Sequence, residues 1–306
     1  MRNRILATGL LAGFLFLSTG SFFAQQQPAL SIEILTTFDY PGRENSTIPE
    51  AINDRGDIAG LYSVWNGSRG FVRFRNGTFS APIIEPNDTG NDTEGRGINH
   101  ARTVCGNYSG SDGFSHGYFL SGGSFTEFDV MGANDTLVEG LNDAGDFVGA
   151  FDTDTQDFTA FSNIGGITTA IVIPGAISSL AFGINSSREI TGQYTDSGGV
   201  FHGWWQDSSG ALHFPFDPPN SIATLPFGIN DQGYIVGRYS NSGVHAFLFK
   251  PSTNSYLTFD FPGAIFFTAF NGINRDGLLC GRYQRASGFH GFLARVVTGQ
   301  ASEVIP

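Results

Sequence analysis

The chain has little charge, one lysine and two cysteines. Only 14% of its 306 residues are charged, Lys250 is the sole lysine, and the formal net charge is −12. Such an acidic surface repels the phosphate backbone of nucleic acids and the head groups of anionic lipids. We therefore expect no nucleic-acid partner.

Beyond the first 24 residues the sequence also lacks long apolar runs and stretches with helical periodicity. It is rich instead in glycine and phenylalanine, with 42 and 30 residues respectively. This composition favours many short strands joined by tight turns over helices or disorder.

Residues 1–24 have the pattern of a signal peptide. Arg2 and Arg4 precede an apolar run from Ile5 to Leu17, and Ala24 can end a cleavage site. The run is short and interrupted by glycines, which favours a signal peptide over an uncleaved N-terminal anchor. Cleavage removes both arginines and changes the net charge from −12 to −14. We expect a secreted protein, periplasmic or extracellular, with no membrane insertion after the signal is removed.

A repeat runs through the rest of the chain. Six times an Asn is followed seven residues later by a Gly and nine residues later by an aromatic residue. The Asn positions are Asn53, Asn99, Asn142, Asn185, Asn230 and Asn274. A constant period of about 44 residues indicates one supersecondary unit copied around a ring or along an array.

Each copy is predicted to form four short strands, as in one blade of a β-propeller. The third strand of each copy is apolar without alternation, which indicates that both faces of the sheet are covered. We predict an all-β fold, a six-bladed β-propeller that occupies residues 25–306 as a single domain. The predicted blades are 48–86, 93–131, 136–175, 179–219, 223–263, and 266–297 together with 31–41.

In this arrangement the N-terminal strand completes the last blade and leaves no open sheet edge. A propeller of five or seven blades and an open solenoid are the alternatives. A turn follows each periodic Asn, and its fourth position is Gly in four copies. Arg102 and Arg188 stand there in the other two, so we expect those turns to differ in conformation or to be strained.

The segment His245-Ala246-Phe247 and its variants, together with the Gly-Ile-Asn and Gly-x-Tyr elements, resemble the HAF family of extracellular repeats. The variants begin at His116, His202 and His290. The resemblance covers residues 36 to 295, and Arg69 and Thr159 depart from it in copies one and three. It implies an exported propeller-like domain and brings no known activity or site.

The recurring histidines and cysteines are expected to be structural. Equivalent positions in different blades lie too far apart to share one metal ion, so each His is expected to bond backbone at the start of its third strand. Cys105 and Cys280 lie in copies two and six, which are not neighbours in a ring of six. We expect two buried free thiols, with a disulfide as the alternative.

Residues that differ between copies are better candidates for a site. Arg238 and Arg282 occupy the same position in adjacent copies, and two guanidiniums suit a carboxylate or sulfate. The alternative is that neighbouring Asp or carbonyl groups hold them. Trp65 lies in a loop of small polar residues and could stack on a sugar ring, or pack against its own loop.

One loop offers a calcium hypothesis. Asp152, Asp154 and Asp157 alternate in copy three, although neither the Gly nor the Glu of an EF-hand follows them. A solvated hairpin tip is the alternative. We expect no metal elsewhere and no other cofactor.

No unique set of nucleophile, base and orienting acid stands out from the repeat. We therefore expect an exported, monomeric binding module for a glycan, protein or small anion. The alternatives are a hydrolase or lyase that acts on extracellular carbohydrate through carboxylates in an axial funnel, and a structural surface component. A plugged channel with an aromatic or basic rim favours recognition, and a deep funnel with convergent acids favours an enzyme.

Overall fold

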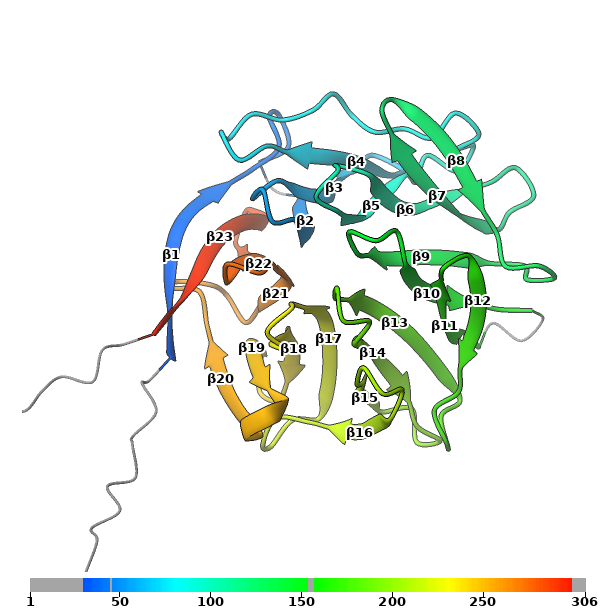
Figure 1. Cartoon of the computed structure of the whole chain (residues 1–306). Coiled ribbons are helices and arrows are strands. Elements are labelled where there is room, and N and C mark those ends of the chain that lie inside the picture. Colours follow the sequence, from blue (N-terminus) through cyan, green and yellow to red (C-terminus); the bar gives the residue numbers. More distant parts are fainter. Residues whose placement is uncertain (1–29, 45, 154–156, 299–306) are drawn as a thin grey trace, which may run out of the picture.

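The computed structural model describes residues 30–44, 46–153 and 157–298. Over these residues the chain forms strands β1 to β23 and one short 3-10 helix, arranged as six radial sheets around a central axis (Figure 1). The six-bladed β-propeller predicted from the repeat is confirmed. The predicted signal peptide, residues 1–24, lies outside the described residues. In the described part of the chain no helix has the length and apolarity needed to cross a bilayer.

The first three blades follow the chain in order. Blade 1 contains β2 (Thr47–Ile52), β3 (Ile58–Val64) and β4 (Gly67–Arg73). Blade 2 contains β5 (Glu94–Ile98), β6 (Val104–Ser109), β7 (Ser115–Ser121) and β8 (Ser124–Phe128). Blade 3 contains β9 (Thr136–Leu141), β10 (Phe147–Phe151), β11 (Thr159–Ile164) and β12 (Ile167–Ile171).

The next two blades repeat this order, and the last uses both ends of the described chain. Blade 4 contains β13 (Ser178–Ile184), β14 (Ile190–Thr195), β15 (Phe201–Gln206) and β16 (Leu212–Phe216). Blade 5 contains β17 (Ala223–Ile229), β18 (Ile235–Ser240), β19 (Val244–Lys250), the 3-10 helix η1 (Pro251–Thr253) and β20 (Ser255–Phe259). Blade 6 contains β21 (Thr268–Ile273), β22 (Leu278–Arg285), β23 (Gly288–Thr298) and β1 (Leu30–Phe38).

Strand β1 closes the ring as the sequence predicted. It pairs antiparallel with β23 from Leu30 opposite Thr298 to Phe38 opposite Gly291, and the two strands lie side by side in Figure 1. The Arg295 guanidinium also reaches the Glu33 carboxylate of β1 at 2.7 Å. No other segment of the described chain pairs with the outer side of β23. Without β1, β23 would therefore be an open edge of the blade 6 sheet.

Blade 1 differs from the predicted four-stranded pattern. Its sheet has three strands, and the fourth position is taken by residues 79–83, which meet β4 only through separate bridges. Pro82 lies within this segment and has no N–H to donate to a ladder. The Ser80 hydroxyl accepts the Val72 N–H at 3.0 Å instead, so the segment still covers β4.

The periodic glycine of each second strand makes room for two neighbours. A Cβ at Gly149 would lie 1.8 Å from the main-chain oxygen of Leu137 and 3.0 Å from the ring of Phe161. The oxygen approaches because the first strand bulges there, and the ring belongs to the third strand, opposite the glycine. The aromatic residues at this third-strand position are fully buried in all six blades: Phe71, Tyr118, Phe161, Trp204, Phe247 and Phe292.

The sequence predicted either a different turn conformation or strain at Arg102 and Arg188. Both turns keep the positive φ of the glycine turns, so they are strained. Arg102 and Arg188 have φ of 67° and 63°, a region that non-glycine residues occupy at a cost. Each guanidinium crosses to the preceding blade and bonds a buried carboxylate, Asp57 at 2.7 Å and Asp146 at 2.9 Å. An inter-blade ion pair thus compensates the backbone strain.

Cys105 and Cys280 are both free and fully buried, as expected. Their sulfurs lie beside Gly97 and Gly272 of the inner strands, so each thiol fills space close to the axis. Burial raises the pKa of both thiols well above the usual range. They act as small apolar side chains.

We predict that the ring closure depends on Phe38. This side chain of β1 is 9% exposed and packs with Ile52 and Ile58 of blade 1, under the Arg73 guanidinium. Phe38→Ala should lower the free energy of unfolding in urea by about 3–5 kcal/mol, the usual cost of a buried Phe. Leu35→Ala, on the exposed side of the same strand, is the control and should cost less than about 1 kcal/mol. Equal losses for the two variants would contradict the closing role of β1.

Candidate functional site

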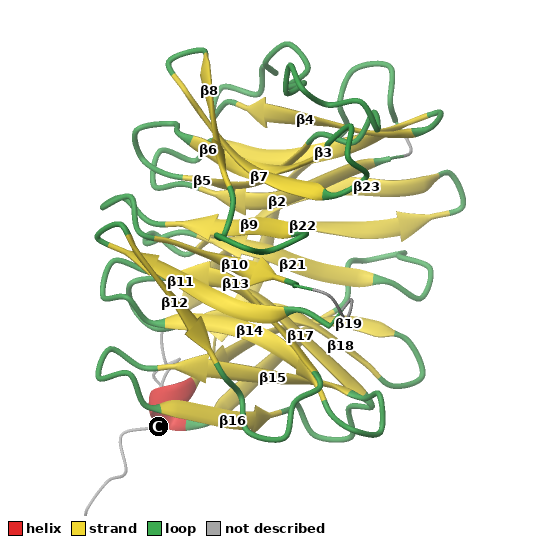
Figure 2. Cartoon of the chain, turned by 90° about the vertical axis from the view of Figure 1, so that its right-hand side faces the viewer, coloured by secondary structure: helices red, strands yellow, loops and turns green. Residues whose placement is uncertain are grey.

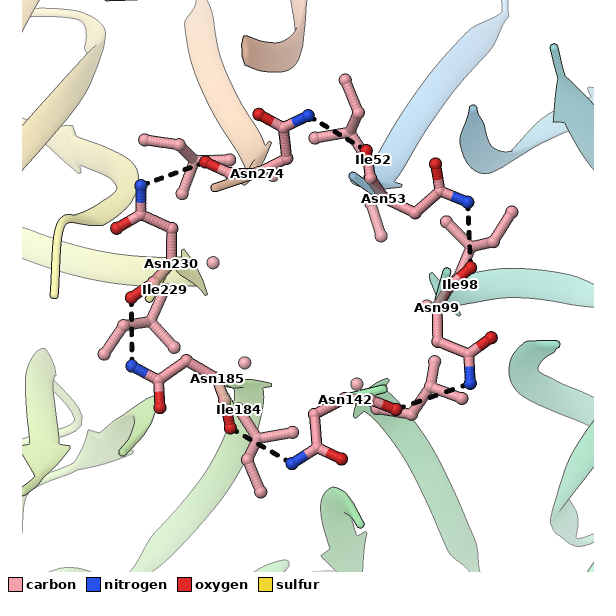
Figure 3. A pocket seen from close by; sticks show the side chains of 18 of the residues that line it. Ile52, Asn53, Ile98, Asn99, Asn142, Ile184, Asn185, Ile229, Asn230 and Asn274 are labelled. Atoms are coloured by element: carbon pink, nitrogen blue, oxygen red, sulfur yellow. Dashed lines mark hydrogen bonds between the residues drawn. The ribbon is translucent and has the colours of Figure 1, made fainter. Parts of the chain in front are cut away.

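The six periodic asparagines form a closed ring of hydrogen bonds around the axis (Figure 3). Each side-chain Nδ2 donates to the main-chain oxygen of the corresponding Asn in the next blade. The distances, from Asn53 through Asn99, Asn142, Asn185, Asn230 and Asn274 back to Asn53, are 2.9, 3.5, 3.1, 3.0, 3.1 and 3.0 Å. All six residues are buried.

The same side chains also build the turns, as the sequence indicated. The Oδ1 atom of Asn274 accepts the N–H groups of Asp276 and Leu278 at 3.1 and 2.9 Å. One amide therefore folds its own turn and ties its blade to the next. The bond to the next blade was not predicted, because the sequence of one repeat does not show which group the neighbouring blade places beside its Asn.

An axial well lies inside this ring. Its cavity volume is about 140 Å³, and its lining includes five carboxylates and two guanidiniums. Asp54, Asp143, Asp231 and Arg275 stand at the mouth on the Asn-turn face, the face that carries the turns after each periodic Asn. Ligand pockets for sugars and similar molecules usually measure about 300–1,000 Å³. The well suits water or a small ion better than a glycan.

Charged side chains plug the channel at the inner end of the well. The Glu50 carboxylate lies 3.4 Å from Arg96 Nη1 and 3.3 Å from Arg282 Nη1, and accepts Asn271 Nδ2 at 2.8 Å. Glu139 lies 3.6 Å from Arg96 Nε, and burial raises the pKa of its carboxyl although Arg96 opposes this. The acids in the channel are thus engaged with cations and amides rather than free for catalysis.

Arg238 and Arg282 lie near the plug, and neither lines the well. Both contact the ring of Phe267, at 5.2 and 5.5 Å from guanidinium carbon to ring centroid, and Arg282 also contacts Phe289. Phe267 belongs to the connection that enters β21. The two arginines therefore sit on the side of the plug where the first strands begin, beneath an aromatic rim.

Arg238 and Arg282 each have a buried guanidinium nitrogen without a hydrogen-bond partner. Among the described residues Arg238 has no carboxylate within ion-pair distance, and its Nε atom is buried without a hydrogen-bond partner. The Nε of Arg282 is likewise buried and unpartnered. Burial and the neighbouring Arg282 lower the pKa of Arg238 to about 10. The alternative named Asp or carbonyl groups as the partners; instead the Glu50 carboxylate holds Arg282.

Exposed apolar side chains gather on one face of the propeller. We call the face where each first strand begins the entry face; it carries the blade-to-blade connections and the loops between second and third strands, and Figure 2 shows the two faces edge-on. Large apolar residues are exposed in these segments at Trp65, Ile84, Phe114, Met131, Val172, Ile177, Val200, Ile222, Ile265 and Phe266, and at Phe201, the first residue of β15. Of those in the described chain, only Leu35 and Ile167 lie elsewhere.

Trp65 and Phe266 are the most informative of these residues. Trp65 is 100% exposed, so it does not pack against its own loop. Phe266 is 79% exposed and has φ of 59°, a conformation that bulky residues rarely adopt. Its carbonyl accepts the Val244 N–H at 2.8 Å, and Ile265 donates to Gln284, so the surrounding chain fixes this conformation. Strain held in this way is frequent at binding sites.

The recurring histidines are structural, but their partner differs from the prediction. Each bonds an Asp carboxylate at the end of its own blade's fourth strand, not the backbone. The pairs are His116 with Asp129, His202 with Asp217, His245 with Asp260, and His290 with Asp39, at Nδ1–O distances of 2.7 to 3.0 Å. The copies that lack the His have Ile84 and Val172 at the Asp position, so the pair is present or absent as a unit.

Two of the three aspartates of the calcium hypothesis lie among the described residues. Asp152 is buried and accepts the Asp135 N–H at 3.3 Å, Asp157 is exposed, and Asp154 lies outside the described residues. Two other groups place three ligand atoms within 4.8 Å of one another. They are Asp54, His100 and Asp143 on the Asn-turn face, and His116, Glu127 and Asp129 in blade 2. Members of both groups are already bonded to protein partners.

No protein-family model matches the chain, and no curated protein matches its sequence. Solved structures match its fold. The lectin of Aleuria aurantia, a six-bladed propeller with a described fucose recognition mode, has a TM-score of 0.53 at 12% identity, over 89% of this chain and 100% of the lectin. A protein named provisionally as a gluconolactonase has a TM-score of 0.51 at 14% identity, over 89% of this chain and 94% of its own.

TolB from Acinetobacter baumannii has a TM-score of 0.53 at 12% identity and matches 70% of this chain. The chain spans 54%, about half, of that protein. At these identities the comparisons establish the propeller fold alone. The resemblance to the HAF family continues to rest on the motifs in the sequence.

We predict that the asparagine ring and the asparagine turns contribute separately to stability. Asn274→Ala removes the bond to Asn53 and leaves turn N–H groups unpaired, and should lower the free energy of unfolding in urea by about 2–3 kcal/mol. Asn274→Asp keeps the turn acceptor, but it replaces the ring donor with a carboxylate oxygen that faces the Asn53 carbonyl, so it should cost about 2 kcal/mol or more. If Asn274→Asp unfolds at the same urea concentration as wild type, the ring bond adds nothing.

The histidine–aspartate pairs predict a pH dependence. Burial lowers the pKa of His116 and of His202, but contacts with Asp129 and Asp217 outweigh it and raise both values. Their stabilisation is complete below the unfolded pKa of about 6.5 and is lost as pH rises through the folded value. The free energy of unfolding should therefore fall as the pH rises above about 6.5. The double variant Asp129→Asn, Asp217→Asn should show a flatter profile, and an unchanged slope would contradict the pairs' contribution.

Proposed function

We propose that this protein is an exported carbohydrate-recognition module that binds its ligand on the entry face. The single observation that carries the proposal is Phe266, an exposed aromatic residue fixed in a strained conformation by backbone hydrogen bonds on both sides. Strain of this kind persists only where the surroundings enforce it, and it concentrates at ligand clamps. Export is supported by the signal-peptide pattern of residues 1–24.

Trp65 supports a sugar as the ligand. Its indole is fully exposed at the tip of the β3–β4 hairpin, between Val64 and the polar residues Asn66 and Ser68. A flat aromatic surface with polar neighbours suits a sugar ring, whose C–H groups stack on the ring and whose hydroxyls bond the polar side chains. The match in fold to a fucose-binding lectin is consistent with this use of the architecture.

The channel gives less support to catalysis. Glycoside cleavage needs one protonated acid and a second free carboxylate. Glu50 and Glu139 face a narrow well, and Arg96, Arg282 and two amide side chains already hold them. A plugged channel with an aromatic and basic rim is the arrangement expected of a recognition module.

We predict that Phe266 and Trp65 contribute to binding and not to folding. A glycan array with the purified protein identifies a ligand, and calorimetry then measures its affinity. Phe266→Gly should weaken binding about tenfold or more and should raise the free energy of unfolding by about 1 kcal/mol, because glycine adopts positive φ without strain. Trp65→Ala should weaken binding and leave stability unchanged.

Ile167→Ala provides the matched control, since Ile167 is 70% exposed but lies off the entry face. It should leave affinity unchanged. Absence of any glycan ligand, or equal loss of affinity in all three variants, would contradict the proposal. Turnover of a polysaccharide that Glu139→Gln abolishes would establish the enzyme instead, and tight association with the cell envelope without a glycan ligand would establish a structural component.

A further inference from the structure

We propose that Arg238, Arg282 and Gln193 form a subsite on the entry face for the carboxylate and an adjacent hydroxyl of an acidic sugar. This inference rests on the proposed function and specifies the class of its ligand. The three residues occupy the same position, between the periodic Gly and the periodic Tyr, in the second strands of three consecutive blades. Gln193 lies in β14, Arg238 in β18 and Arg282 in β22.

Unmet hydrogen-bonding capacity defines the subsite. The Nε atoms of Arg238 and Arg282 are buried donors without partners, and Oε1 of Gln193 is a buried acceptor without one. Gln193 is 8% exposed. In blades 1 to 3 the same position holds Leu61, Asn107 and Ala150, and Asn107 is satisfied by Glu139 and the Val138 N–H. At this position the unmet groups are confined to blades 4 to 6; elsewhere in the described chain Arg73, Arg96 and Asn271 also carry buried polar atoms without a partner.

Charge points to an anion. Glu50 is the only carboxylate in the described chain within ion-pair distance of either arginine, and it is shared between Arg282 and Arg96. Arg238 therefore has no ion-pair partner, and Glu50 acts on its charge only from a greater distance, inside a protein whose overall formal charge is −12. A buried charge is costly without a counter-ion, and water can solvate it but cannot neutralise it.

The aromatic neighbours orient the two guanidiniums. Arg238 lies over the rings of Phe227 and Phe267, at 5.9 and 5.2 Å, and Arg282 lies over Phe267 and Phe289. Rings that contact guanidinium faces leave the edges, where the N–H donors lie, available for bidentate contact with an oxyanion. The exposed Phe266 is adjacent in sequence to Phe267, which places the subsite beside the strained residue.

The ligand is a monoanion with hydroxyl donors. Polyanions such as nucleic acids or heavily sulfated chains are strongly repelled by the acidic surface, whereas one carboxylate on a neutral body is repelled far less. The free acceptor of Gln193 requires a donor, which a carboxylate lacks and a sugar hydroxyl supplies. A hexuronate combines both groups on one ring.

The test compares two sugars that differ only at one carbon. Glucuronate and glucose are titrated into the wild-type protein, and binding is followed by calorimetry and by the Arg Nε–H resonances in NMR spectra. We expect glucuronate to bind about tenfold or more tightly than glucose and to shift the Arg238 and Arg282 signals. Equal affinity for the two sugars would overturn the proposal, as would sulfate binding as tightly as glucuronate, which would mark a general anion site.

Arg238→Gln separates a binding role from a structural one. Because Arg238 has no ion pair to lose, the variant should unfold in urea at the same or a higher concentration than wild type, while its preference for glucuronate disappears. Arg285→Gln, at an exposed arginine of the same face, is the matched control and should keep the preference. Loss of stability in Arg238→Gln with binding unchanged would show a structural arginine and overturn the proposal.

The results also distinguish this subsite from the proposed function. Binding of neutral glycans that depends on Trp65 and is indifferent to Arg238→Gln would leave the recognition face standing and remove the subsite. Glucuronate binding that depends on Arg238 and is indifferent to both Trp65→Ala and Phe266→Gly would support the subsite and remove the recognition face.

Discussion

The ring of asparagine amides is the interaction on which the rest of the propeller depends. Each amide crosses a blade boundary with its nitrogen and folds its own turn with its oxygen, so the local turn and the global closure share one side chain. The last bond joins Asn274 to Asn53, 221 residues apart in sequence. Fixing the spacing of the inner strands in this way sets the width of the channel and the positions of all loops on both faces.

Because the ring and the buried third-strand aromatics carry the architecture, other positions are free to differ between blades. The channel shows this clearly: the residue before each inner glycine or alanine is Glu50, Arg96 or Glu139 in blades 1 to 3, Phe182 or Phe227 in blades 4 and 5, and Asn271 in blade 6. The residues that line the channel thus differ between blades, although the blades themselves repeat. The charged side plugs the channel, and the aromatic side borders the arginines beneath the entry face.

Much of the fold could be predicted from the sequence, because the period, the turn glycines and the unpaired strand 31–41 each reflect local chemistry that recurs. The inter-blade role of Asn53 and its equivalents could not, since it depends on how neighbouring copies meet. The carboxylate partners of the histidines left a signal, namely that Asp and His are present or lost together. Phe266 left none, because its positive φ is imposed by the Val244 N–H, which donates to the Phe266 carbonyl, and by the Ile265 N–H, which donates to the Gln284 carbonyl. Trp65, Arg238 and Arg282 stood out only by departing from the repeat.

The pairing of β1 with β23 also dictates the order of assembly. The first strand of the described chain pairs with the last one, from Leu30 against Thr298 onward. Until β23 has been synthesised, β1 has no partner strand in blade 6 and the circle of blades stays open.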